Sequence, residues 1–411
     1  MKYDVIRSYW PAPIYSDGST LDLEFTTGTL DSRLTFTRAA GTATYINSSG
    51  YVTTAAANTP RFDYDPVTLA PRGLLIEGTA INLLKYSQYA DTNWLVYGGF
   101  SKPSPYVLVT SPANDTTAAK INFGAVGNGM YTNNSLMGYT NTVGATYTVS
   151  AWIRATVNTN NANIRFGDSA VATGPNIPIS TTWTRYSYSY TAVTNSGPAI
   201  QSASGTATGE FEMWGFQLEL GSGASSYIPT VASQVTRNAD NCYIYDATTS
   251  GGLSWFKTAT QGTIYVEAYK RTAGTAFAGA LHGTRATSTQ DFMLYQAIGN
   301  NWLSLNWGAS EYVTNYSALS SPFLIKSAVA FSPGSPTTKA DSTVSINGSN
   351  SALTTTPNIA LPFASDLFCI GSRGSAGGVA PTQNYADTAI RRIKFYPVAM
   401  TAAQMNTLTT L

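Results

Sequence analysis

TFTRAAGTATYINSSGYVTTAAANTPRFDYDPVTLAPRGLLIEGTAINLL, the stretch at residues 35–84, decides the expected fold. It is rich in threonine, alanine, tyrosine and glycine, has few charges, and shows no helical period. Turns are expected before the apolar segment GLLIE, because the chain there contains Pro60, Pro66, Pro71 and Gly73. We therefore expect a rigid connector.

The composition of the whole chain indicates the same structural class. Only 11% of the 411 residues are charged, while threonine, serine, asparagine, glycine and tyrosine are abundant. Such a composition suits many short strands joined by tight turns. Because the chain exceeds the usual length for one hydrophobic core, we predict an all-β protein of two or three domains.

Charge and apolar patterning exclude several classes of partner. The 23 basic and 22 acidic residues are spread along the chain, so we expect no binding to nucleic acid. No run approaches eighteen apolar residues, and the start MKYDVIRSYW has no apolar signal region. We expect no membrane insertion. We also expect the protein to be synthesised in a cytoplasm. Cys242 and Cys369 are too few for a zinc set or a disulfide scaffold, and are expected as reduced core residues.

Alternating strands separated by Asn, Gly and Thr clusters predict one β-sandwich over residues 85–240. In YTVSAWIRA at 147–155 the period of two places Trp152 and Arg154 on the polar face, opposite the apolar core residues. In WTRYSYSYT at 183–191 the tyrosines form one face of a strand.

A second sandwich is predicted for residues 241–411. GTIYVEAYK at 262–270 has the alternation of a half-buried strand. The pair Asn347 and Gly348 predicts a two-residue hairpin turn, because both residues tolerate positive φ. Thr401 can cap a short C-terminal helix in TAAQMNTL.

Five short motifs within residues 35–84 resemble a segment of tailed-bacteriophage virion proteins, namely tail fibres and head spikes. These motifs are FTRA, TATY, PRFDYDP, APRGLLIE and NLL. YTVSAWIRA, TTWTRYSYSYT and FEMWGFQLELGSGASSYIPT resemble carbohydrate-binding jelly-roll modules. The strand order after residue 241 resembles the laminin-G or concanavalin A-like jelly roll.

These resemblances imply a domain plan. Residues 1–84 would form an extended N-terminal attachment segment, followed by two consecutive antiparallel β-sandwich (jelly-roll) domains at 85–240 and 241–411. They also imply a homotrimer at the virion surface, bound to other virion proteins through the N-terminal region. A host surface glycan is the expected further partner.

No catalytic set is expected in this chain. The single histidine, His282, has no second histidine and no GxSxG motif to accompany it, so we predict a structural or surface role. Glu210 and Glu212 share a strand face at i, i+2 spacing, but no glucanase-like acid pattern surrounds them. We favour the interpretation that both side chains are solvent-exposed at the start of a strand.

Other carboxylates have structural interpretations. Asp63 and Asp65 are predicted to be turn residues, with Arg61 able to pair with either. The resemblance to calcium-bearing jelly rolls makes a structural calcium ion possible, with Glu219 or Asp291 as guessed ligands. No other cofactor is expected.

Sugar binding needs flat apolar rings beside amides, hydroxyls or charges. Alternation places six candidate carbohydrate-binding residues on polar strand faces: Trp152, Arg154, Trp183, Arg185, Trp302 and Asn306. The alternative is that a neighbouring subunit covers these outward rings.

The functional hypothesis is a non-enzymatic tail fibre or head spike that displays glycan-binding sandwiches for host adhesion. A purely structural protein that decorates the capsid or bridges tail components is one alternative. A polysaccharide depolymerase is the other.

Overall fold

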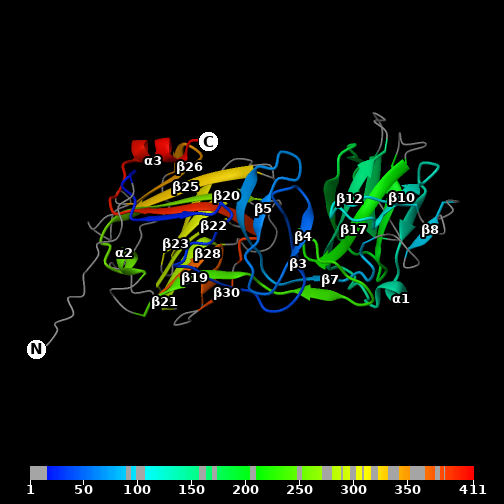
Figure 1. The fold of residues 1–411 in the computed structure, drawn as a ribbon, viewed down its shortest axis with the longest axis horizontal. Coiled ribbons are helices and arrows are strands. Elements are labelled where there is room, and N and C mark those ends of the chain that lie inside the picture. The colour runs from blue at the N-terminus through cyan, green and yellow to red at the C-terminus, as the bar shows by residue number, and fades with distance from the viewer. Residues whose placement is uncertain are drawn as a thin grey trace, which may run out of the picture.

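The computed structural model describes residues 16–88, 94–98, 107–156, 163–168, 174–203, 210–247, 252–270, 280–287, 290–296, 302–307, 310–315, 323–331, 342–351, 366–374, 380–383 and 385–411. For the strands between 280 and 315, the description covers the backbone. The described residues form an all-β protein of antiparallel sheets, which confirms the predicted class. Two sandwiches of unequal size lie end to end (Figure 1).

The larger sandwich is built from two wide sheets. The strands of the first are β1 (Leu21–Glu24), β5 (Phe62–Tyr64), β6 (Pro71–Ile76), β20 (Gly262–Lys270), β25 (Phe323–Phe331), β26 (Ser342–Ile346), β27 (Ser349–Ser351) and β31 (Thr388–Tyr396). Their order is β27-β26-β25-β20-β31-β6-β5, and β1 also pairs with β31.

The second sheet of the larger sandwich faces the first across the apolar core. Its strands are β2 (Thr35–Thr37), β19 (Asn241–Tyr245), β21 (Ala280–Thr287), β22 (Gln290–Gln296), β23 (Trp302–Trp307), β24 (Ser310–Asn315) and β28 (Leu367–Ile370). They run in the order β2-β19-β28-β21-β22-β23-β24. The core between the sheets joins Leu21 and Phe36 from the N-terminal part to Ile264, Phe368 and Ile393 from the C-terminal part.

The smaller sandwich has two five-stranded sheets. One sheet, in the order β15-β12-β17-β10-β9, contains β9 (Leu108–Val109), β10 (Ala118–Asn122), β12 (Thr146–Ala155), β15 (Thr184–Thr191) and β17 (Glu210–Leu220). The other, in the order β14-β13-β16-β11-β8, contains β8 (Leu95–Tyr97), β11 (Gly129–Tyr131), β13 (Asn163–Asp168), β14 (Ile177–Pro178) and β16 (Pro198–Ser202). Val149, Ala151 and Ile153 pack in the core between them, as the alternation predicted.

Short elements complete the chain. The strand pairs are β3 (Ala43–Ile46) with β4 (Val52–Ala55), β7 (Ala80–Asn82) with β18 (Val235–Arg237), and β29 (Arg373–Gly374) with β30 (Pro381–Gln383). The helices are α1 (Asn134–Met137), α2 (Ser254–Lys257) and α3 (Ala402–Thr409). Within the described part of the chain, no helix has the length and apolar character needed to cross a bilayer.

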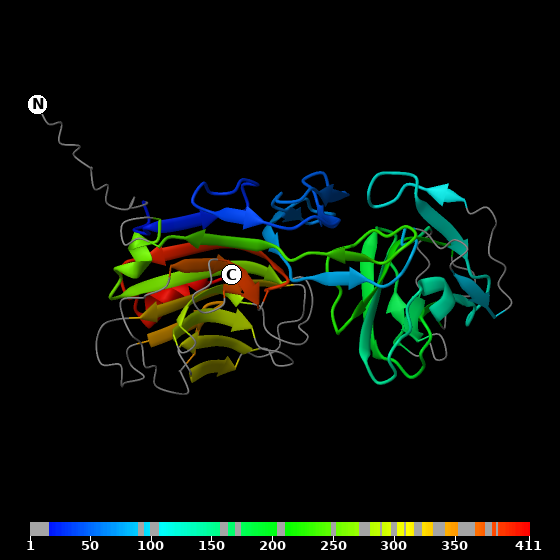
Figure 2. The ribbon, with the colours of Figure 1, turned by 90° about the horizontal axis from the view of Figure 1, so that it is seen from below.

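The N-terminal region is part of the larger sandwich, which differs from the predicted plan of a separate segment followed by two consecutive domains. Strand β1 pairs with residues 392–395 of β31, β6 pairs with residues 388–390 of the same strand, and β2 pairs with β19. Figure 2 shows the blue N-terminal strands lying along this sandwich. The smaller sandwich is therefore an insertion, entered through β7 and left through β18. Local alternation identifies an apolar strand face, but it does not specify a partner strand more than 300 residues away.

Several local predictions are confirmed. Asn347 and Gly348 have φ of 46° and 79°, and they connect β26 to β27. Thr401 forms a capping box with Gln404 at the start of α3. Cys242 and Cys369 are buried free thiols. They lie on opposite faces of their sheet, because Cys242 stands opposite Ile370 in the β19–β28 ladder.

Candidate functional site

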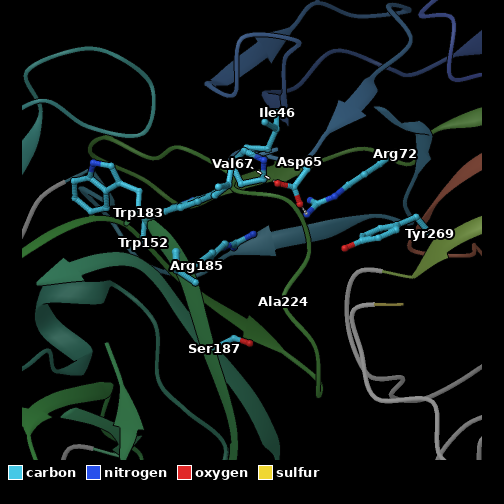
Figure 3. Close-up of a pocket in the computed structure, with 12 residues that line it drawn as sticks. Ile46, Asp65, Val67, Arg72, Trp152, Trp183, Arg185, Ser187, Ala224 and Tyr269 are labelled. Carbon is cyan, nitrogen blue, oxygen red and sulfur yellow. Dashed lines mark hydrogen bonds and ion pairs between the residues drawn. The ribbon is translucent and has the colours of Figure 1, made fainter. Parts of the chain in front are cut away.

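A cavity of about 350 Å³ lies between the two sandwiches (Figure 3). Its walls come from three parts of the chain: the connector before β7, the smaller sandwich, and strand β20 of the larger sandwich. The lining residues are Ile46, Asp65, Pro66, Val67, Arg72, Trp152, Trp183, Thr184, Arg185, Ser187, Ala224 and Tyr269. Three of the six predicted sugar-binding residues, namely Trp152, Trp183 and Arg185, thus come together here.

Trp183 is a partly buried ring in the residue just before β15. The Arg154 guanidinium lies over this ring, 4.8 Å from its centroid, a cation–π contact. Glu212 holds Arg154 in turn, through an Nε to Oε2 hydrogen bond of 2.5 Å. Arg154 is therefore a residue that positions Trp183, and it does not itself line the cavity.

Trp152 is only 7% exposed, although strand alternation places it on the polar face of β12. It packs in a cluster with Ile46 and Val52 of the β3–β4 hairpin and with Trp214 and Tyr227 of its own sandwich. A neighbouring subunit was the alternative expected to cover this ring. The chain's own connector covers it in the structure. Among the described residues, the indole Nε1 of Trp152 has no hydrogen-bond partner.

Arg185 lies on the same wall of the cavity as Trp183. Its guanidinium donates to the carbonyl of Ser225 at 2.5 Å and to Ser150 Oγ at 2.9 Å. These bonds to neutral acceptors hold the side chain across the face of the sheet. Glu219, a guessed calcium ligand, lies nearby and accepts hydrogen bonds from Gln217 Nε2, Ser225 N and Ser225 Oγ.

The opposite wall centres on Arg72 and Tyr269. The Arg72 guanidinium lies 4.7 Å from the centroid of the Tyr269 ring and donates to Asp65 Oδ2 at 2.8 Å. Asp65 also accepts from the amides of Val67 and Thr68, as a turn residue should. Burial opposes ionisation of Asp65, but these amide hydrogen bonds and the charge of Arg72 lower the pKa of its carboxyl below the usual range.

A buried ionic cluster holds the junction beside the cavity. Its members are Arg38, Arg61, Glu77, Arg237 and Asp240. Asp240 bridges the Arg38 and Arg61 guanidiniums, and Glu77 accepts from Arg61 Nη1 at 2.8 Å. The predicted pairing of Arg61 with Asp63 or Asp65 is therefore wrong.

The cluster is drawn from four short segments of the sequence. Its members lie in FTRA, PRF, LLIEG and TRNAD, and they tie the chain together where it enters and leaves the smaller sandwich. Glu77 also accepts from the backbone and side chain of Ser226, at 2.7 and 2.6 Å. The block at 35–84 is thus a structural junction between the sandwiches.

The remaining predicted positions divide into two groups. Glu212 is a buried ion-pair residue, and not the solvated strand start we expected; Glu210 pairs with Lys120 at 2.9 Å. Among the residues described, no group of three or more His, Cys, Asp or Glu side chains could hold a metal ion. The side chains of His282, Asp291, Trp302 and Asn306 lie outside the described part, although the backbones of their strands pair within the second sheet.

The sequence interpretation missed Arg72, Asp65 and Tyr269 as site residues. Tyr269 could have been identified from the sequence, because alternation in β20 puts it on the face opposite the core residues Ile264 and Val266. Arg72 could not, since only folding brings it over the Tyr269 ring.

Comparison with known proteins gives only remote structural likenesses. No protein-family model and no curated protein sequence matches the chain. The CBM40 module of the Ruminococcus gnavus IT-sialidase, solved with α2,3-sialyllactose, is 16% identical; the match covers 41% of this chain and 91% of that one, with a TM-score of 0.32. The leech intramolecular trans-sialidase is 18% identical over 41% of this chain and 26% of its own, with a TM-score of 0.31. The SAP-like pentraxin of Limulus polyphemus is 17% identical over 37% and 70%, with a TM-score of 0.28. At these scores the matches say nothing about the ligand or activity of this chain.

Proposed function

We propose that the protein is a non-enzymatic structural component of a bacteriophage virion, a tail fibre or head spike, and that it binds glycans for host adhesion. The resemblance of residues 35–84 to virion proteins supports the assignment to a particle. The cavity between the sandwiches is the observation that carries the binding function.

The chemistry of the lining favours a sugar. Trp183 and Tyr269 supply flat rings that can cover the apolar face of a pyranose. Thr184, Ser187 and Arg185 supply donors and acceptors for its hydroxyl groups. Loss of Trp183 should therefore remove glycan binding without unfolding the chain, because this ring is only partly buried.

The carboxylates favour binding over hydrolysis. A glycoside hydrolase uses two carboxyl groups on either side of the scissile bond. Among the described lining residues, Asp65 is the single carboxylate, and it is already engaged by the turn and by Arg72. Glu210 and Glu212 are paired with Lys120 and Arg154.

A glycan array probed with the purified protein tests adhesion. We expect binding to bacterial polysaccharides that disappears in Trp183→Ala and persists in Tyr245→Ala, a control at an exposed ring outside the cavity. A blank array from a protein that antibody labelling places on intact virions would favour the purely structural alternative. Release of reducing ends, abolished by Glu212→Gln, would establish a depolymerase.

Assembly is tested separately from binding. The virion resemblance leads us to expect a homotrimer, which light scattering on the purified protein would detect. Labelled antibodies viewed by electron microscopy would place the protein on the head, collar or tail. Particles without label would contradict the virion assignment.

A further inference from the structure

The turn between β5 and β6 leads from the wall of the interdomain cavity to the outer surface. Asp65, Pro66 and Val67 line the cavity, and Leu69 follows two residues later. Backbone hydrogen bonds fix the turn, because Leu69 N donates to the carbonyl of Asp65 at 3.0 Å and Asp65 N donates to the carbonyl of Ala70 at 2.9 Å. Val67 and Leu69 are therefore held in defined places beside the cavity.

Both apolar side chains of this turn face solvent. Val67 is 66% exposed and Leu69 is 46% exposed. Val67 also lines the cavity, and Figure 3 shows it beside Asp65. We call the side chains of Val67 and Leu69 the apolar lip. This lip continues the lining of the cavity outward, so a ligand seated in the cavity would extend over it.

Leu69 has a backbone conformation that leucine rarely adopts. Its φ is +59°, in the left-handed region. Five other non-glycine positions in the described part of the chain have positive φ, and four of them are asparagine or aspartate, which tolerate this region: Asn58, Asn114, Asn347 and Asp387. Folding alone would favour asparagine at position 69 as well, because leucine is strained there and stays half exposed.

The turn of the neighbouring β3–β4 hairpin supports the lip from one side. A Cβ on Gly50 would lie 2.9 Å from Leu69 Cδ2 and 2.8 Å from the carbonyl oxygen of Pro66, so the two turns are in close contact. Gly50 has φ of +82°, which this approach requires to remain a glycine. One side of Leu69 is thus packed, and the other side is accessible to a ligand.

From these observations we propose that the cavity takes a sugar that carries a methyl-terminated substituent, either an acyl group or a deoxy carbon, and that this group packs on the apolar lip of Val67 and Leu69. This inference rests on the glycan-binding function proposed above. The hydroxyl groups of an unmodified pyranose gain nothing from contact with valine and leucine, because they lose water there without a new hydrogen bond. A methyl group buried against the lip gains about fourfold in affinity.

The test is an array of matched pairs. Acetylated bacterial oligosaccharides are printed beside their deacetylated forms, and 6-deoxy oligosaccharides beside their hydroxylated counterparts. The full chain is compared with Leu69→Asn, Val67→Ser and the control Val398→Ser, an exposed valine at the opposite end of β20 from Tyr269. We expect the wild type to prefer the methyl-bearing member by about fourfold in one kind of pair, which identifies the substituent. Leu69→Asn and Val67→Ser should remove this preference, and Val398→Ser should retain it.

Leu69→Asn also separates binding from folding. Because asparagine tolerates positive φ, this variant should raise the urea midpoint while it loses the preference. A lowered midpoint would show that the fold needs leucine at this position, and would refute the argument from its backbone.

Each other outcome overturns a stated part. Equal binding to both members of every pair, lost in Trp183→Ala, would keep the cavity as a glycan site and refute the methyl-bearing class. A preference that persists in both Leu69→Asn and Val67→Ser would refute the lip as the contact. A blank array would refute the proposed function together with the inference.

Discussion

Replacing Asp240 by asparagine should destabilise the protein more than any other isosteric change at the junction. The carboxylate of Asp240 is fully buried, pairs with Arg38 and Arg61, and accepts the amide hydrogen of Glu77 at 3.0 Å. Three guanidiniums and two carboxylates make up the cluster, so it already has an excess of positive charge. Asp240→Asn increases that excess in a place that water does not reach.

The magnitude follows from the burial of the pair. Removing one partner of a buried ion pair costs about 3–5 kcal/mol, because the remaining charge is left uncompensated. Burial opposes protonation of Arg61, and the charges of Asp240 and Glu77 raise its pKa above the ordinary value, so Asp240→Asn removes one of the two carboxylates that favour the charged guanidinium. Against a stability of about 5–15 kcal/mol for a folded domain, the loss is large.

The assay is urea denaturation followed by tryptophan fluorescence and circular dichroism. The matched control is Asp31→Asn, which breaks a partly exposed pair with Arg33 and should cost at most about 1 kcal/mol. Arg237→Met separates charge from packing, because Arg237 is buried with no hydrogen-bond partner among the described residues and its removal lowers the positive excess. We expect it to cost less than Asp240→Asn. A loss below about 1 kcal/mol for Asp240→Asn, or a larger loss for Arg237→Met, would refute the reasoning.

Three further predictions concern backbone, pH and capping. Gly73→Ala should lower the urea midpoint strongly, because φ is +107° and a Cβ would lie 2.2 Å from the carbonyl oxygen of Ile390; an unchanged midpoint would contradict this close approach. Burial raises the pKa of Tyr385 to about 12, so its neutral form stabilises the fold below pH 10, and this contribution is lost as the pH rises from 10 through 12. Tyr385→Phe should therefore make the free energy of unfolding fall less steeply across that window, and an identical slope would show that Tyr385 titrates normally. Thr401→Ala removes the capping box of α3 and should cost about 1 kcal/mol in the same denaturation assay, whereas a neutral result would show that packing alone holds the helix.

Three of the twelve residues that line the cavity were predicted from the sequence. Alternation within YTVSAWIRA and WTRYSYSYT placed Trp152, Trp183 and Arg185 on one face of a sheet, and that face does line the cavity. The same pattern could not show whether an outward-facing side chain is exposed to solvent or covered by another segment, because it describes one strand at a time. Trp152 was therefore predicted to be an outward-facing ring, whereas the β3–β4 hairpin buries it.

The opposite wall of the site depends on contacts between distant segments. Arg72 reaches Tyr269 only because β6 and β20 both pair with β31 in one sheet. Arg61 looked like a partner for its neighbours Asp63 and Asp65, yet its charge is matched by Asp240, which lies 179 residues away. Nearness in sequence did not predict these ion pairs.

The sequence by itself determined the β class, the strand faces, the Asn347–Gly348 turn and the cap of α3, because each depends on side chains a few residues apart. Tertiary structure alone decided that Leu21 pairs opposite Phe395, that the smaller sandwich is an insertion, and that a cavity forms where the sandwiches meet. The physical reason is that an apolar strand face can be buried against many partners. The choice among them is made by the packing and charge balance of the whole chain.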